Sequence, residues 1–296
     1  MTSQHIPRLS IGLPVFNGQA YLASAIESIL AQTYSDFELI ISDNASTDNT
    51  PAICDEYARR DNRVRVHRNE ANIGATQNFY LVHKLSRGEL FALAADDDLY
   101  DPRYMEACID VLDQDKDVAV CHSRTRIIDE SGAYGRVMDV AVNTTSPFPH
   151  ERLYQLLFND YLCIQLYGVM RSAVLARTKV FEGYYGCDRN TLAELCLLGK
   201  IAEVPEVLFY HRLYPAALGW IVHSGKSIHE MAAEDPGTDW SRRSTESTVW
   251  RNYFGSVQRH VDSPLERARC YVVLFRFVAG ALPQRLKRIL ARVRGY

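Results

Sequence analysis

Three adjacent carboxylates, Asp96-Asp97-Asp98, have the clearest chemical potential in this sequence. Neighbouring carboxylates repel one another, and a hard divalent cation offsets that repulsion. Mg²⁺ and Mn²⁺ are commonly held by one or two carboxylates together with phosphate oxygens of a substrate. A solvated acidic turn is the commoner explanation of such a triplet taken alone. The position of this one, directly after the apolar run Leu90–Ala94, favours a metal site.

The elements that must position the triplet alternate between two periodicities over the first 120 residues. Four β-rich runs predict strands at Leu9–Val15, Phe37–Ser42, Val64–Val66 and Leu90–Ala94. Helical patterns lie between them, near residues 22–30, from Thr50 (as N-cap, with Pro51 in the first helical position) and over residues 75–86. This alternation predicts an α/β fold with a Rossmann-like, mainly parallel sheet flanked by helices.

Polar residues follow each of the four predicted strands. In order along the chain they are Asn17-Gly18, the segment Asp43–Asp48, the segment Asn69–Gly74 and the Asp triplet. Ligands of an open parallel sheet bind at the carboxyl ends of its strands. We therefore expect the four loops to surround one crevice.

The second half is less regular. We expect helices near 102–114, 151–158 and 188–199, and strands near 118–128, 164–170 and 201–210. Residues 130–150 have a loop-like composition, residues 212–240 have no clear period, and residues 241–296 have a helical pattern. The resulting division is a catalytic domain over 1–215 (donor half 1–125, acceptor half 126–215), a mobile loop over 216–240 and a helical C-terminal extension over 241–296.

Taken in order, four motifs resemble those of family 2 glycosyltransferases, which have the GT-A fold. They are Pro14-Val15-Phe16-Asn17-Gly18, Ser42–Thr50, Asn72-Ile73-Gly74, and Ala95-Asp96-Asp97-Asp98 with Pro102. The resemblance is strong over residues 7–125 and weaker over 165–215. It implies inverting transfer of a sugar from a nucleoside-diphosphate sugar to a hydroxyl of a glycan or lipid-linked acceptor, in polysaccharide biosynthesis, with Mn²⁺ or Mg²⁺ as cofactor.

The resemblance also implies which residues contact the donor nucleotide: Pro14, Val15, Asn17, Asn72 and Gly74. Asp43 accepts a hydrogen bond from the base, typically the N3–H of uracil, which favours UDP- or dTDP-sugars. The other explanation of Asp43 is a turn residue that caps the next helix, a role that better suits Ser46 and Asp48.

Within the triplet, the resemblance implies that Asp96 faces the ribose or sugar near the metal, that Asp98 ligates the metal directly, and that Asp97 shares either duty. Ala95 stands where the family commonly has an acid, which leaves this assignment open by one position. Many relatives have a histidine where this chain has Tyr214. His211 is then the substitute metal ligand, and the alternatives are His223 or no substitute at all. Arg212 pairs with the diphosphate, and a structural role for either His211 or Arg212 stays open.

Asp188 is the candidate general base, because the segment Gly183–Arg189 resembles the region of the family's catalytic carboxylate. A base there removes the proton of the acceptor hydroxyl as it attacks the anomeric carbon. A helix N-cap is the alternative for Asp188. Glu194 is the reserve candidate and is otherwise expected to be an acid on the helix surface. The loop over 212–240 would close over the donor.

Other functions fit less well. The net charge of −3 argues against a nucleic-acid partner. His223–Ser227 resembles the end of a P-loop but lacks its first glycine, and no Gly-x-Gly-x-x-Gly follows the first strand. The triplet is followed by Leu99-Tyr100, which does not complete the motif of haloacid dehalogenase phosphatases. The non-enzyme alternative is a nucleotide-sugar-binding or scaffold protein that has lost catalysis, consistent with Ala95 and Tyr214.

The sequence also bears on location. No basic segment followed by an apolar stretch opens the chain, and no run reaches the about 20 apolar residues of a spanning helix. Seven scattered cysteines predict reduced thiols in a cytoplasmic protein. Leu286, Ile289, Leu290 and Val293 share one helical face among basic residues. That face either packs on the enzyme body or contacts the inner face of a membrane. No oligomeric state is indicated.

Overall fold

A mixed β-sheet forms the centre of the computed structural model, which describes residues 5–138, 142–159, 163–180, 186–214 and 246–293. The strand order is β3-β2-β1-β4-β8-β6-β9-β5, with β7 paired to β6. The strands are β1 (Leu9–Val15), β2 (Phe37–Asp43), β3 (Val64–Arg68), β4 (Leu90–Leu93), β5 (Leu99–Tyr100), β6 (Val118–Ile128), β7 (Tyr134–Val137), β8 (Val169–Arg171) and β9 (Lys200–Arg212).

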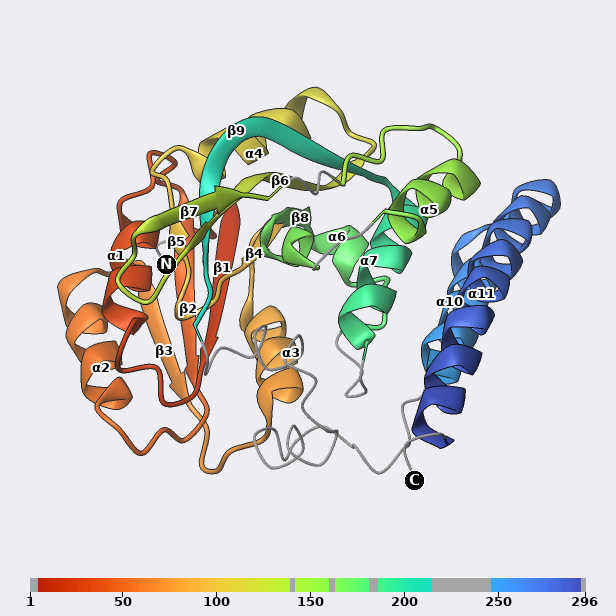
Figure 1. The fold of residues 1–296 in the computed structure, drawn as a ribbon. Coiled ribbons are helices and arrows are strands. Elements are labelled where there is room, and N and C mark those ends of the chain that lie inside the picture. The colour runs from red at the N-terminus through yellow and green to blue at the C-terminus, as the bar shows by residue number, and fades with distance from the viewer. Residues whose placement is uncertain (1–4, 139–141, 160–162, 181–185, 215–245, 294–296) are drawn as a thin grey trace.

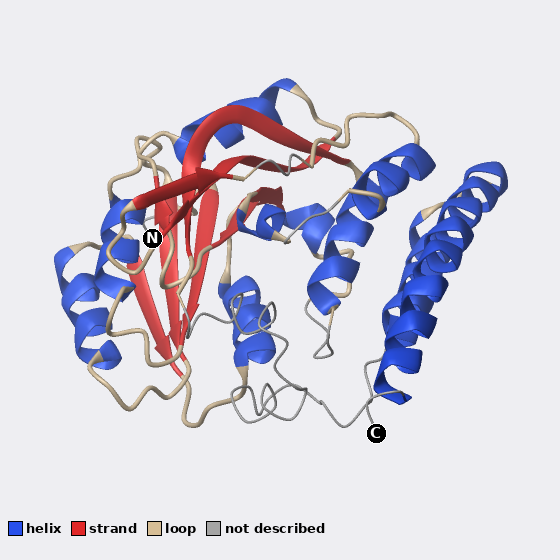
Figure 2. Cartoon of the chain, in the orientation of Figure 1, coloured by secondary structure: helices blue, strands red, loops and turns tan. Residues whose placement is uncertain are grey.

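Helices flank the sheet, and the last two lie side by side at one end of the molecule (Figures 1 and 2). The α-helices are α1 (Leu22–Leu30), α2 (Thr50–Arg60), α3 (Ala75–Leu85), α4 (Tyr104–Gln114), α5 (Pro149–Leu157), α6 (Ser172–Leu175), α7 (Cys187–Leu198), α10 (Glu246–His260) and α11 (Pro264–Val293). A 3₁₀ helix, η1, covers Ile164–Tyr167.

The predicted parallel sheet is confirmed in the first half. β1 pairs in parallel with both β2 and β4, and β2 pairs in parallel with β3. Every residue of β1 and β2 is buried, as expected for strands with packed elements on both faces. β8 and β5 run antiparallel to their neighbours, so the sheet is mixed toward its second half.

Several predicted elements differ from the structure. The strand expected over 164–170 begins as η1, where the Gly168 amide donates to the Gln165 carbonyl at 3.1 Å, and only β8 is extended. The loop-like stretch 130–150 contains β7, which forms an antiparallel pair with β6. The C-terminal extension is two helices, because Pro264 cannot continue α10 and instead begins α11.

Some predictions lie outside the described part of the chain. They include the loop over 216–240, His223 and the segment 181–185 before Asp188. The side chains of Leu286, Ile289, Leu290 and Val293 are also outside it, so their membrane contact stays a prediction. No helix among the described residues is long and apolar enough to cross a membrane. All seven cysteines are free thiols and six of them are buried, as predicted.

Candidate functional site

Several hydrogen bonds join the loops after β1 and β2. The Asn17 amide donates to Ser46 Oγ at 2.9 Å, and the Gly18 amide donates to Thr50 Oγ1 at 2.9 Å. The Gln19 amide donates to Asp48 Oδ2 at 3.1 Å, and Asn17 Oδ1 accepts from the Thr47 amide at 2.9 Å. Asn17 has a left-handed φ of 53°, which asparagine tolerates better than most residues. The two strand ends therefore present one fixed surface.

Thr50 does not cap α2 as expected. The helix begins at Thr50 with Asn49 as its N-cap, and the Thr50 hydroxyl accepts from Gly18 in the neighbouring loop. The Thr50 amide is satisfied instead by Asp48 Oδ1 at 2.9 Å, in agreement with the capping role expected of Asp48.

Asp43 ends β2 with a buried carboxylate. It accepts from the Ser46 amide at 3.0 Å and from Arg68 Nη1 at 2.6 Å. Arg68 Nη2 also donates to the Ser46 carbonyl at 2.9 Å, so the turn is held on two sides. Asp43 is therefore a turn residue, as the alternative proposed. A contact with the donor base is compatible with this position and stays a prediction.

A network of buried asparagines, which sequence reasoning missed, fixes the Asn72–Gly74 loop. Asn44 Nδ2 donates to Asn72 Oδ1 at 2.8 Å, and Asn44 Oδ1 accepts from Asn69 Nδ2 at 3.0 Å. Asn69 Nδ2 also reaches Asn78 Oδ1 at 3.1 Å. Asn72 Oδ1 receives the Gly74 amide at 2.8 Å, where Gly74 has a positive φ of 85°. The sequence signal that could have predicted this network is the presence of four asparagines, which lie in the loops after the second and third strands and near the start of the following helix.

The Asp triplet follows β4, next to the loop after β1. A Cβ atom placed on Gly18 would collide with Asp96 Oδ2, so this carboxylate rests directly on the glycine backbone. Asp96 and Asp97 are partly exposed. Burial and the neighbouring carboxylates raise the pKa of both residues above the ordinary aspartate value. A bound cation would offset the electrostatic cost of ionising both carboxylates.

Asp98 has no exposed surface, and its carboxylate contacts the last two residues of β9. Its Oδ1 accepts from the Arg212 amide at 2.8 Å and lies 3.0 Å from His211 Nδ1. Burial opposes the charged form of His211, but Asp98 outweighs it and raises the pKa of His211. The structure thus brings together two predicted metal ligands, His211 and Asp98, which are hydrogen-bonded to each other.

Arg212 is buried, and its guanidinium group donates hydrogen bonds to backbone carbonyls. Nε donates to the Asp97 carbonyl at 2.8 Å, and Nη1 donates to the carbonyls of Asp129 and Glu130 at 2.9 and 3.0 Å. The guanidinium carbon also lies 4.5 Å from the centre of the Tyr21 ring. These contacts are structural, and pairing with a diphosphate stays a prediction.

The triplet fits one particular kind of cation site. Among the described residues, no group of three or more His, Cys, Asp and Glu converges as a complete protein cage would require. Asp96 and Asp97 instead suit a Mg²⁺ or Mn²⁺ ion that takes its other ligands from phosphate and water. Tyr214 interacts with Asp97, and the ring centres of Tyr214 and Tyr21 are 5.2 Å apart. Tyr214, at the position where many relatives have a histidine, therefore lies beside the Asp triplet.

Asp188 is the second residue of α7. The N-cap of this helix is Gly186, so the alternative of Asp188 as an N-cap is wrong. Asp188 interacts with the buried Cys163 thiol through a hydrogen bond. Burial raises the pKa of Tyr167, and the charges of the triplet and of Asp188 raise it further. Charge effects weaken with distance, so Tyr167 lies within electrostatic reach of both the triplet and Asp188.

Glu194 is not the surface acid that was expected. It is buried and accepts from the Lys179 amide at 2.6 Å and from Ser256 Oγ at 2.9 Å. Arg259 and His260 of α10 complete the set of partners. The helical pattern of α7 missed this burial because α10, more than 50 residues later in the chain, covers that face.

Comparisons with known proteins agree with this geometry. Residues 10–184 match the family model described as Glycosyl transferase family 2. The chain is 30% identical over 154 residues to the putative glycosyltransferase EpsH of Bacillus subtilis, covering 51% of this chain and 43% of EpsH. It is 35% identical over 113 residues to the glycosyltransferase GlyG of Streptococcus pneumoniae, covering 38% of each chain. The chain thus spans less than half the length of these two relatives.

The fold is similar to that of S. aureus TarS (residues 1–349). A crystal structure of TarS in complex with UDP superposes with a TM-score of 0.64 at 16% identity, covering 93% of this chain and 72% of TarS. A complex of TarS with UDP-GlcNAc superposes with a TM-score of 0.63 at 15% identity, covering 92% of this chain and 71% of TarS. At this identity the likeness establishes the GT-A-like fold.

Proposed function

Because this chain belongs to glycosyl transferase family 2, we propose that it transfers a sugar from a nucleoside-diphosphate sugar to a hydroxyl of a glycan or lipid-linked acceptor, with inversion at the anomeric carbon. UDP- and dTDP-sugars are the preferred donors, consistent with the UDP and UDP-GlcNAc complexes of TarS. The observation that carries the proposal is the contact between Asp96 and Gly18, which joins the end of β4 to the loop after β1.

Each donor contact in the proposal comes from a strand end. Pro14, Val15 and Asn17 border the nucleotide, and Asp43 accepts from the N3–H of the base. Asn72 and Gly74 shape the adjoining loop. The hydrogen bonds among these loops support the proposal, because a site that is already ordered loses little freedom when the donor binds.

We propose that Asp97 and Asp96 would hold a Mn²⁺ or Mg²⁺ ion at the donor diphosphate. The burial of Asp98 and its bonds to His211 and Arg212 favour a positioning role for Asp98. When bound, the ion neutralises charge that develops on the departing nucleoside diphosphate. Asp96 and Asp97 would supply the carboxylate ligands of this ion, and Tyr214, which lies beside Asp97, would orient that side chain.

Asp188 is the proposed base that takes the proton of the acceptor hydroxyl. Its place in the first turn of α7 keeps the carboxylate on a rigid element, as a catalytic group requires.

The test is turnover of UDP- and dTDP-sugars with Mn²⁺ or Mg²⁺ across a panel of glycan and lipid-linked acceptors. Asp188→Asn should lower kcat about 100-fold or more, the range typical of a lost general base. Asp97→Asn should lower turnover similarly and weaken the dependence on metal. Asp55→Asn, on the exposed face of α2, is the matched control and should leave turnover unchanged.

Two outcomes would count against the assignments. Full activity of Asp188→Asn would remove it from the role of base. Donor binding by calorimetry without turnover on any acceptor would favour the non-catalytic alternative. Asp98→Asn distinguishes the two roles of Asp98: lost turnover at an unchanged Tm indicates a direct ligand, whereas a lowered Tm indicates the tie to β9.

A further inference from the structure

The outward face of α11 carries large apolar side chains in a row. Leu265, Val272 and Phe275 are 62%, 57% and 64% exposed. Their spacing of seven and three residues places them on one face of the helix. Single exposed apolar residues are common on protein surfaces, whereas several large ones on one helix face are typical of a contact surface.

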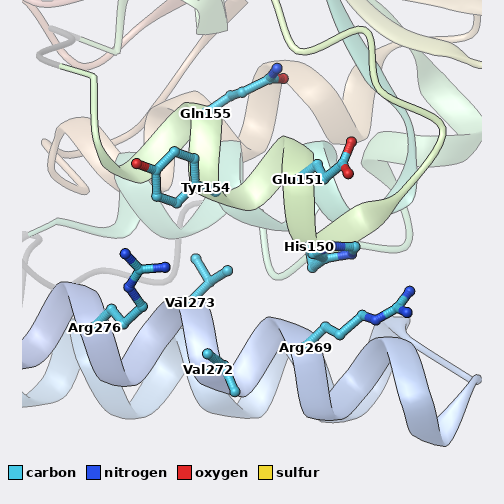
Figure 3. A pocket seen from close by; sticks show the side chains of 8 residues that line it. All are labelled: His150, Glu151, Tyr154, Gln155, Arg269, Val272, Val273 and Arg276. Atoms are coloured by element: carbon cyan, nitrogen blue, oxygen red, sulfur yellow. The ribbon is translucent and has the colours of Figure 1, made fainter.

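One member of this row, Val272, lines a groove between α5 and α11, which Figure 3 shows. The groove has a volume of about 550 Å³, and its lining includes Tyr154 of α5 opposite Val272 and Val273 of α11. Tyr154 and Phe158 are each 44% exposed, and their rings stack with centres 4.6 Å apart. The apolar surface therefore spans two helices.

Two arginines and two acids lie at this surface, and Arg276 differs from the others in its partners. Arg269 and Arg276 line the groove. Arg269 donates to Glu266 Oε1 at 2.6 Å, and the other oxygen of Glu266 lies 2.7 Å from His150 Nδ1, so Arg269 and Glu266 form an ion pair with each other. Glu151 also lines the groove and is hydrogen-bonded to Ser146 Oγ. Arg276 has no ion pair among the residues that the structure describes.

Basic residues outnumber acidic residues in the sequence of α11 and the residues that follow it. The segment from Arg267 to the C-terminus contains eight arginines and lysines and no acid, although the whole chain has a net charge of −3. Apolar side chains flanked by cations on one helix are the pattern of helices that lie in the interface of an anionic membrane.

We propose that the face formed by Leu265, Val272, Phe275, Arg269 and Arg276 docks on an anionic phospholipid surface. The apolar row enters the boundary of head groups and acyl chains while Arg276 pairs with a lipid phosphate. A second copy of the chain is the less suitable occupant, because a two-fold contact through this face brings the same cations together. This inference does not depend on the proposed transferase activity, since its readout is binding alone.

The test is co-sedimentation of the full chain with vesicles of phosphatidylcholine, with and without phosphatidylglycerol. Binding should require phosphatidylglycerol and weaken as salt is raised. The double variant Val272→Ser/Phe275→Ser should bind about tenfold more weakly or worse, because two exposed apolar anchors are removed. Arg276→Gln should cost about fivefold. Ile6→Ser, equally exposed at 62% but far from α11, is the matched control.

Since all four positions are exposed, the variants should retain the wild-type Tm, and thermal melting checks this. Equal sedimentation with both vesicle types would overturn the proposal, as would unchanged binding of the double variant. Light scattering that shows a dimer of the wild type and a monomer of the double variant would assign the face to a second copy and overturn it as well.

Discussion

At the scale of single residues, Gly18 leaves the space that the Asp96 carboxylate occupies. A methyl group there would collide with Asp96 Oδ2 and would lie 2.6 Å from Val15 Cγ2. We expect Gly18→Ala to displace Asp96 and to lower kcat/KM about 10-fold or more, because small errors in the position of a catalytic group are costly. Steady-state kinetics with a saturating acceptor measures the effect.

Gly280→Ala is the control for this substitution. Nothing lies within 4 Å of the position of the added Cβ at Gly280, and the residue is exposed on α11. Alanine favours a helix by about 1 kcal/mol over glycine, so stability should stay equal or rise. A Gly18→Ala enzyme as active as Gly280→Ala would show that Asp96 does not need its observed position.

The same residues show what the sequence can and cannot reveal. The triplet and its nearness to Gly18 were predictable, because both follow strands of one parallel sheet and strand ends meet at a common edge. The partition of duties inside the triplet was not predictable. It depends on β9, more than 100 residues later, which buries Asp98 through His211 and Arg212 while Asp96 and Asp97 stay partly exposed.

At the scale of elements, Glu194 holds α7 against α10. Burial raises the pKa of Glu194, but hydrogen bonds from His260, Arg259 and neighbours outweigh it and lower the pKa to about 2. A carboxylate whose pKa falls on folding stabilises the folded state above its unfolded pKa, here 4.5. This stabilisation, on the order of 3 kcal/mol, should be lost as the pH falls from about 4.5 toward 2.

We therefore expect Glu194→Gln to lower the free energy of unfolding at pH 7 by about 3 kcal/mol, because Arg259 loses its counterion and the hydrogen bond with His260 is weakened. The difference from wild type should shrink as the pH falls below 4.5. Urea denaturation at several pH values measures both effects. Glu56→Gln removes an exposed pair with Arg60 and should cost less than about 0.5 kcal/mol. Equal losses for the two variants would contradict the assigned role of Glu194.

Elements were predictable where local pattern decides them. The helices and strands of the first half follow from apolar period and turn residues. β5 and β7 were missed because they are only two and four residues long and are ordered by pairing with β9 and β6. η1 was expected to be a strand, because a short apolar run does not by itself distinguish the two.

At the scale of the whole molecule, β9 joins the two halves. It begins directly after α7, which carries Asp188, and it ends at His211 and Arg212 beside the triplet. Along its length it runs parallel to β6, and near its end it pairs with β5. The proposed base and the proposed metal site are thus connected through one continuous strand.

A molecule with this site should be stabilised by its donor nucleotide. Ligand at 100 times its Kd adds about 2.7 kcal/mol to the free energy of unfolding. For a chain of this size that corresponds to a rise in Tm of about 5 °C. We expect UDP with Mn²⁺ to produce such a rise in a thermal melt.

ADP with Mn²⁺ should produce a smaller rise in Tm, because adenine has no N–H at the ring position from which Asp43 would accept a hydrogen bond. Asp97→Asn should lose the metal-dependent part of the shift while Asp55→Asn keeps it. Equal shifts with UDP and ADP would argue against base recognition by Asp43, and no shift with either nucleotide would argue against a donor site at these strand ends.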